Sequence, residues 1–80
     1  MNKIVLITGA SKGIGRALTE KMLNEDYFVI GTSRNGEIKN FEHINICSLK
    51  LDLSDTSSIE NAQKEIFSKF KHIDILINNA

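Results

Sequence analysis

Three glycines lie close together in one segment of the chain that could hold a phosphate group. The segment, residues 8–15, reads T-G-A-S-K-G-I-G and begins at the end of a run of β-branched and aliphatic residues. Gly9 lets the chain turn sharply off a strand, Gly13 lets a pyrophosphate approach the backbone, and Gly15 lets a helix pack closely against a sheet. The N–H groups at the start of that helix would then face the pyrophosphate. Because glycines in so short a span cost stability, a turn that binds nothing is the weaker interpretation.

The spacing of the glycines excludes two common phosphate-binding motifs. A P-loop that started at Gly9 would need Gly-Lys at positions 14 and 15, where the chain has Ile-Gly. The dinucleotide fingerprint G-x-G-x-x-G does not fit either. The pattern that fits is T-G-x-x-x-G-x-G.

The elements that must position this segment are strands and helices in alternation. Continuous apolar and β-branched runs are typical of strands buried on both faces of a parallel sheet. Apolar residues at three- and four-residue spacing are typical of amphipathic helices. The predicted strands cover residues 3–8, 27–33, 46–53 and 73–78, and the predicted helices cover residues 14–25 and 55–70. With right-handed crossovers, this order predicts an α/β fold with a parallel sheet ordered 3-2-1-4 and flanking helices.

Length and composition exclude several classes of protein. The 80 residues have room for one small domain, and 41% hydrophobic with 25% charged residues is typical of a globular chain. The 10 basic and 10 acidic residues cancel, so no net charge attracts nucleic acid or an anionic membrane. No apolar run approaches the roughly 20 residues of a membrane-spanning helix, and the N-terminus lacks the apolar region of a signal peptide. We therefore expect a cytoplasmic protein that binds neither nucleic acid nor membranes.

Residues further along the chain extend the glycine pattern. Asp52 stands at the end of the third predicted strand, and Asn78, Asn79 and Ala80 close the fourth. Together with the glycine motif, this order resembles the N-terminal part of the short-chain dehydrogenase/reductase family, and the resemblance covers all 80 residues. It implies that residues 1–80 form the NAD(P)-binding Rossmann-like portion of such an enzyme. That portion would be a single incomplete domain, the truncated half of a doubly wound fold.

The resemblance also implies a cofactor site. The positions that match the family's pyrophosphate turn are Gly9, Ser11, Gly13, Ile14 and Gly15. Asp52 and Leu53 match the pair that recognises adenine. Asn78, Asn79 and Ala80 match a segment that steadies the central sheet and passes beside the adenosine ribose. For Asn78, a structural role in which the amide satisfies backbone groups at the strand end is an equal alternative.

Two basic residues favour NADP over NAD as the cofactor. A site for NAD places a carboxylate about 20 residues past the glycines, where it accepts a hydrogen bond from the ribose 2′-hydroxyl. The second predicted strand instead ends G-T-S-R, so no acid stands there to repel a 2′-phosphate. Arg34 can present a planar fork of donors to that phosphate. Lys12 is the other basic position that NADP-preferring relatives use, and we therefore expect NADP to bind better than NAD.

The catalytic residues of the family are absent from these 80 residues. The family's chemistry needs a serine and then Tyr-x-x-x-Lys, in which the tyrosine acts as acid and base. The single tyrosine, Tyr27, is followed four residues later by Gly31, so we expect Tyr27 to be structural. The single cysteine, Cys47, is expected to be an inert strand residue, and no Cys/His cluster has the spacing of a metal site. We predict no catalytic residue, no bound metal and no turnover by this chain alone.

Three places in the chain depart from the pattern of the family. Residues 35–43 are polar, contain the turn dipeptide Asn-Gly and are too short for a full helix with its loops, so we expect a reduced crossover of about one helical turn. Asp26 and Lys71 stand where the family often ends a helix with glycine. The left-handed helix cap must therefore be adopted by aspartate or avoided.

Other functions fit parts of the pattern. One alternative is a stand-alone nucleotide-binding or interaction module without catalysis. Another is a methyltransferase-like Rossmann domain, which the missing acid after the second strand disfavours.

The last predicted strand, residues 73–78, would form an edge of the sheet. An apolar edge strand with unpaired N–H and C=O groups favours pairing with another chain. We therefore expect self-association through this strand.

Overall fold

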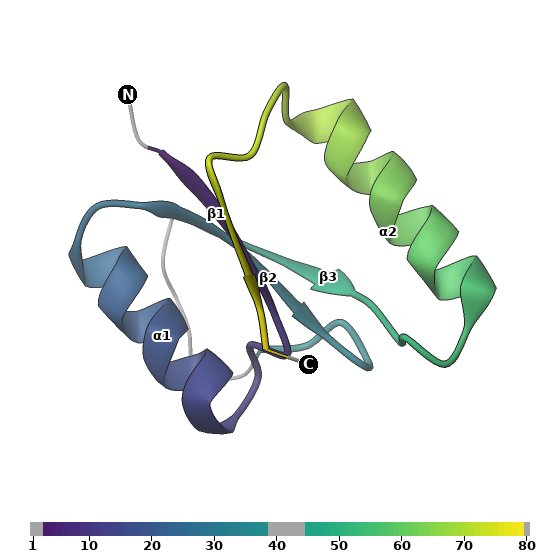
Figure 1. Ribbon diagram of the computed structural model, residues 1–80, viewed down its shortest axis with the longest axis horizontal. Coiled ribbons are helices and arrows are strands. Elements are labelled where there is room, and N and C mark those ends of the chain that lie inside the picture. Colours follow the sequence, from purple (N-terminus) through teal and green to yellow (C-terminus); the bar gives the residue numbers. More distant parts are fainter. Residues whose placement is uncertain (1–2, 39–44, 80) are drawn as a thin grey trace.

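A computed structural model describes residues 3–38 and 45–79, whose strands and helices follow the order β-α-β-β-α-β (Figure 1). The strands are β1 (Ile4–Thr8), β2 (Phe28–Ser33), β3 (Ile46–Lys50) and β4 (Ile75–Asn78). The helices are α1 (Gly13–Asn24) and α2 (Thr56–Lys69). The presence and order of the predicted elements are confirmed.

The strands form one parallel sheet in the order β3-β2-β1-β4. This is the predicted order, and it places β1 in the interior of the sheet, between β2 and β4. In the register, Leu6 of β1 lies opposite Ile30 of β2 and Leu76 of β4. Because parallel strands all end at the same edge of a sheet, the segments that follow them are brought together there.

The two helices cover opposite faces of the sheet (Figure 1). On one face, Leu23 of α1 packs into a core cluster with Val5 and Val29, whose side chains are fully buried. On the other face, the ring of Phe28 lies 5.5 Å from the ring of Phe70, the residue that follows α2. Successive residues of a strand point to opposite faces, so Phe28 and Val29 lie on different faces of the sheet.

The third strand ends earlier than predicted, at Lys50 rather than at residue 53. The backbone N–H of Asp52 donates to the side-chain oxygen of Ser58 at 2.9 Å, and the backbone N–H of Ser54 donates to the carboxylate of Asp52 at 3.0 Å. These bonds replace strand pairing with a turn that leads into α2. The alternation of apolar residues therefore continues past the point where the chain leaves the sheet.

The fourth strand begins later than predicted, at Ile75 rather than at residue 73. Before it, the backbone N–H of Asp74 donates to the carbonyl oxygen of Ile4 at 2.9 Å. The carboxylate of Asp74 accepts from the backbone N–H of Ile4 at 2.8 Å. Because a side chain takes the place of a backbone carbonyl here, the regular ladder starts only after Asp74.

The two helices end in different ways, and neither end has the glycine that the family often places there. Asp26, after α1, adopts a φ of 64°, which is the left-handed conformation. In the described part of the chain no other non-glycine residue has a positive φ, and Phe70 leaves α2 in an extended conformation with a φ of −129°. The predicted short crossover begins with a turn and no helix over residues 34–38, and its residues 39–43 lie outside the described ranges.

Candidate functional site

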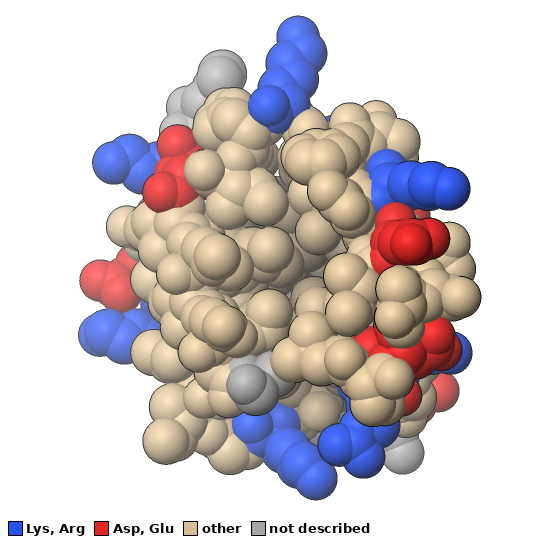
Figure 2. Space-filling model, turned by 45° about the vertical axis from the view of Figure 1, so that its right-hand side comes forward, with Lys and Arg blue, Asp and Glu red and all other residues tan. Residues whose placement is uncertain are grey.

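An open cleft of about 700 Å³ lies at the edge where the strands end. The residues that line it come from the ends of the four strands and the segments after them: Gly9, Ser11, Lys12, Ser33, Arg34, Asn35, Leu51, Asp52, Leu53, Ser54 and Asn79. Figure 2 shows Lys and Arg side chains gathered at the lower end of the molecule, the end at which Figure 1 places the start of α1. Ligands of open parallel sheets bind in the crevice at this edge.

The glycine segment has the geometry of a phosphate cradle. Gly9 turns the chain away from β1 with a φ of 66°. Gly15 packs tightly, because a methyl group there would overlap the carbonyl oxygen of Gly9 and come within 2.6 Å of Nδ2 of Asn79. Gly13 differs: it has a φ of 63°, and a methyl group there would meet nothing within 4 Å. The backbone beside Gly13 is therefore open to an incoming group.

The start of α1 is suited to an anion. Lys12 occupies the cap position in an extended conformation, and among the described residues no side chain forms a capping hydrogen bond there. The first turn of α1 contains no acidic residue. The N–H groups and the positive end of the helix dipole are therefore available to a bound phosphate.

Hydrogen bonds from the end of β4 hold the glycine segment in place. The side-chain amide of Asn79 donates to the carbonyl oxygen of Gly9 at 3.1 Å. The backbone N–H of Asn79 donates to Oγ1 of Thr8 at 2.9 Å, and that hydroxyl donates to Oδ1 of Asn78 at 3.0 Å. Asn78 thus has a structural contact, although its partner is the side-chain hydroxyl of Thr8 and not the backbone groups that the sequence interpretation expected. Ala80, the third residue of this predicted segment, lies outside the described residues.

A second support comes from the end of β2. The carbonyl oxygen of Thr32 accepts from the backbone N–H of Ala10 at 2.8 Å, and its hydroxyl accepts from the backbone N–H of Gly9 at 3.3 Å. Thr32 is only 2% exposed. The turn after β1 is therefore fixed between β2 on one side and β4 on the other.

Charged side chains of both signs line the cleft. Lys12 and Arg34 are exposed, and both line the cleft. Among the described lining residues, Asp52 is the only acid. Hydrogen bonds from the side chain and backbone of Ser54 hold the pKa of Asp52 below its usual value, and the positive charges of Arg34 and Lys50 act in the same direction. Asp52 therefore remains a carboxylate at neutral pH.

The cleft contains most, though not all, of the predicted cofactor-binding residues. The predicted residues that line it are Gly9, Ser11, Lys12, Arg34, Asp52, Leu53 and Asn79. Gly13, Ile14 and Gly15 begin α1 beside it, and Ile14 is 72% exposed without lining the cleft. The lining residues missed by the sequence interpretation are Ser33, Asn35, Leu51 and Ser54. Their position next to predicted strand ends was the signal that could have identified them.

Among the described residues, neither Tyr27 nor a cluster of metal ligands lies in this cleft. Tyr27 packs half-buried against the core cluster on the α1 face, which agrees with a structural role. In residues 3–38 and 45–79, no group of three His, Cys, Asp or Glu residues could hold a metal ion. No helix in the same ranges is long and apolar enough to cross a membrane.

Comparison with known sequences identifies the family. The sequence pattern of the short chain dehydrogenases matches residues 3–80. The chain is 46% identical over 76 residues to an uncharacterized oxidoreductase of Schizosaccharomyces pombe, covering 95% of this chain and 26% of that protein. It is 44% identical over 82 residues to the 3-oxoacyl-[acyl-carrier-protein] reductase FabG of Escherichia coli, covering 98% of this chain and 34% of that protein. The chain thus spans about a quarter to a third of the length of these relatives.

Comparison with solved structures agrees. A short-chain dehydrogenase from Streptomyces avermitilis superposes with a TM-score of 0.89 at 31% identity, covering all of this chain and 31% of that one. A short-chain dehydrogenase from Leptospira borgpetersenii, solved with bound NAD+, superposes with a TM-score of 0.87 at 29% identity, covering 100% of this chain and 32% of that one. The chain belongs to the short-chain dehydrogenase family and has its Rossmann-like fold.

Proposed function

We propose that this chain is the NADP-binding portion of a short-chain oxidoreductase and that its cleft holds the adenosine 2′-phosphate and the pyrophosphate of the cofactor. The observation that carries the proposal is that Lys12 and Arg34 line the same cleft, next to a glycine turn that is open at Gly13. Family membership supports a nicotinamide dinucleotide as the cofactor. When bound, that cofactor supplies or accepts a hydride in carbonyl and alcohol chemistry.

The residues of the cleft fit the parts of the cofactor. The pyrophosphate would lie against Gly13 and the uncapped start of α1, where the structure leaves open space and N–H donors. Asp52 and Leu53 would hold the adenine, and Leu53 presents an apolar side chain that is 54% exposed. Asn79 would lie beside the ribose, since it both lines the cleft and holds the glycine turn.

The choice of NADP over NAD rests on the end of β2. Family membership does not decide it, because the related structure from Leptospira borgpetersenii contains NAD+. A carboxylate at the end of β2 would accept from the ribose 2′-hydroxyl of NAD, but the segment 31–34 has no acid and ends in Arg34. A guanidinium binds a phosphate through two parallel hydrogen bonds, which favours the 2′-phosphate of NADP.

Calorimetric titration with 2′,5′-ADP and 5′-AMP tests this proposal. We expect the chain to bind 2′,5′-ADP more tightly, and Arg34→Ala to reduce that affinity about tenfold to a hundredfold, the value of one charge-assisted hydrogen bond. Affinity for 5′-AMP should stay unchanged in the variant. Equal affinity of the unchanged chain for the two nucleotides would refute the choice of NADP.

The proposal includes no turnover by these 80 residues alone, because they contain no Tyr-x-x-x-Lys. NADPH consumption in the presence of a panel of aldehydes and ketones measures this. Turnover that survives purification and disappears in Gly13→Asp would contradict it.

A cytoplasmic location remains a prediction from the sequence. A non-catalytic binding module is not favoured, since the family match extends over residues 3–80.

We also propose that two copies of this chain associate through β4. In the described sheet β4 lies at the edge, paired only with β1, and its Leu76 is 63% exposed. An unpaired edge with an exposed apolar side chain favours pairing with a second strand. Sedimentation over a concentration series should show self-association that Leu76→Lys weakens. A single monomeric species at every concentration would contradict this.

A further inference from the structure

Arg34 stands in a tight turn directly after β2. The backbone N–H of Gly36 donates to the carbonyl oxygen of Ser33 at 3.3 Å, so Arg34 and Asn35 occupy the two central positions of the turn. Gly36 has a φ of 84°, a left-handed value that favours glycine. The conformation of this turn determines where the guanidinium of Arg34 can reach.

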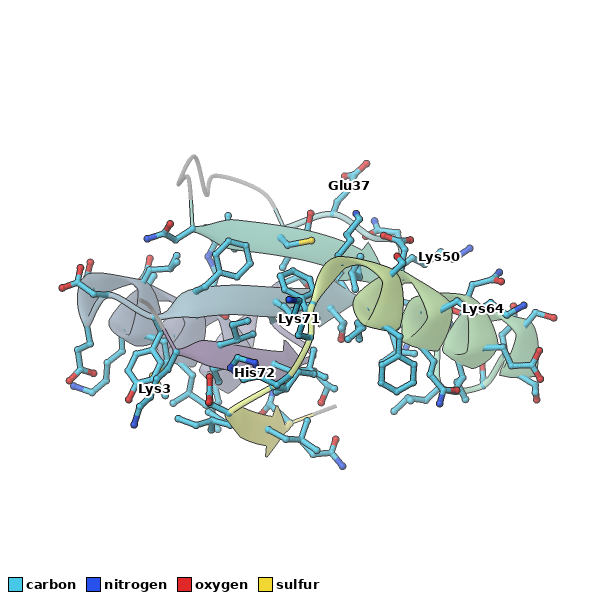
Figure 3. The ribbon with its side chains drawn as sticks, turned by 90° about the horizontal axis from the view of Figure 1, so that it is seen from above. Lys3, Glu37, Lys50, Lys64, Lys71 and His72 are labelled. Atoms are coloured by element: carbon cyan, nitrogen blue, oxygen red, sulfur yellow. The ribbon has the colours of Figure 1, made fainter. Side chains whose placement is uncertain are left out.

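The turn rests on the end of β3. A methyl group at Gly36 would come within 3.3 Å of Cβ of Lys50, so the two backbones are in close contact. Figure 3 shows Glu37, the next residue, and Lys50 at the same end of the sheet. The backbone beyond the turn is thus anchored, whereas the two central residues are exposed.

The side chain of Asn35 holds the turn together. Its Oδ1 accepts from the backbone N–H of Glu37 at 3.0 Å and from the hydroxyl of Ser33 at 3.3 Å. Ser33 is only 4% exposed, so this oxygen connects the turn to a fixed point at the end of β2. Within the described ranges, no other side chain forms a hydrogen bond across this turn.

We propose that Asn35 is a positioning residue for Arg34, and that by fixing the turn it sets the preference for a 2′-phosphate. The inference rests on the proposed NADP site. Arg34 is long and exposed, so a mobile turn would have to be ordered when the phosphate binds, and that ordering lowers affinity. Asn35 removes this cost because its two hydrogen bonds order the turn in advance.

The test measures the preference for 2′,5′-ADP over 5′-AMP by calorimetric titration of the unchanged chain and of variants. Asn35→Ala removes both hydrogen bonds and should lower the preference about threefold to tenfold. Asn35→Ser keeps an oxygen that can accept from an N–H two residues further on, so it should retain most of the preference. In an Arg34→Ala background, Asn35→Ala should cause no further loss, because its effect passes through Arg34.

The outcomes separate this inference from the proposed function. Equal affinity of the unchanged chain for both nucleotides overturns the choice of NADP and this inference with it. A preference that is present in the unchanged chain but survives in Asn35→Ala overturns the inference alone. So does an equal loss of affinity for both nucleotides, which marks a general structural role, and so do additive losses in the double variant, which mark a direct contact. Thermal unfolding checks that each variant is folded.

Discussion

The two helices of this chain begin in opposite ways. Both follow a strand of the same parallel sheet. α2 begins after Asp55, whose side chain accepts from the backbone N–H of Ser57 at 3.0 Å. α1 begins after Lys12, with no capping side chain among the described residues. The N–H groups at the start of α2 are therefore partly bound by the chain's own side chain, whereas those at the start of α1 have no such cap in the described part of the chain and suit the proposed phosphate.

The difference in capping predicts that the start of α1 is the less stable of the two helix starts. Aspartate is among the best residues for a helix cap, and a carboxylate there also interacts favourably with the helix dipole. Lysine supplies neither contribution. It does place a positive charge in the cleft that Arg34 also lines, where the proposed phosphate would lie. The weaker helix start thus belongs to the candidate site.

The largest effect is expected at the glycines of the α1 start. Gly15→Ala should destabilise the fold by about 3 kcal/mol, because its methyl group would overlap the carbonyl oxygen of Gly9. Gly13→Ala is the matched variant, with a cost of about 1 to 2 kcal/mol for the left-handed backbone. Only Gly13→Ala should cost more free energy of nucleotide binding than free energy of unfolding. Its methyl group would enter the open space in which we propose that the pyrophosphate lies. Urea unfolding and calorimetry measure both quantities, and equal destabilisation would contradict the close packing at Gly15.

Lys12→Asp makes the start of α1 resemble that of α2. The new carboxylate should raise the free energy of unfolding by about 1 kcal/mol. It should also reduce the affinity for 2′,5′-ADP about tenfold to a hundredfold, because a proposed charge-assisted contact is lost. Lys64→Asp, which makes the same charge change on α2 away from the cleft, is the control. A variant that is less stable and still binds the nucleotide would contradict the contrast between the helix starts.

Asp55→Ala makes the opposite change, at α2. Loss of the cap should lower the free energy of unfolding by about 1 kcal/mol. Nucleotide affinity should not change, because Asp55 does not line the cleft. Ser57→Ala keeps the backbone N–H that Asp55 binds and should stay within about 0.5 kcal/mol of the unchanged chain. If Asp55→Ala also abolished nucleotide binding, the two helix starts would not be independent.

The smallest effect is expected from Asp52, in the turn that leads to α2. Hydrogen bonds from Ser54 hold its pKa below the ordinary value of 3.8, and a carboxylate of this kind stabilises the fold above that value. The stabilisation is lost as the pH falls through the lower pKa of the folded state. Asp52→Asn should therefore be less stable than the unchanged chain at about pH 7, and the difference should shrink below about pH 4. A difference that urea unfolding finds equal at every pH would contradict this.

Much of the fold was predictable because it depends on neighbours in the sequence. Apolar runs and helical spacing predict the elements, and the handedness of crossovers leaves the order 3-2-1-4, which is confirmed. The predicted end of β3 was wrong because it depends on a residue elsewhere in the chain. Leu51 and Leu53 continue the strand pattern. The backbone N–H of Asp52, however, donates a hydrogen bond to the hydroxyl of Ser58 in α2 instead of pairing with another strand.

The candidate site, too, was predictable from the sequence in part. The sequence by itself determined which positions lack a side chain, where the basic residues stand, and that the segment 31–34 at the end of β2 has no acid. The oxygen of Asn35 bonds only to residues two positions away, so the turn that carries Arg34 is local. Only the tertiary structure decided that the side-chain amide of Asn79 holds the carbonyl of Gly9, 70 residues away, and that its backbone N–H donates to the hydroxyl of Thr8. Such bonds depend on how the strands are aligned, and a shift of one residue would turn each side chain to the other face of the sheet.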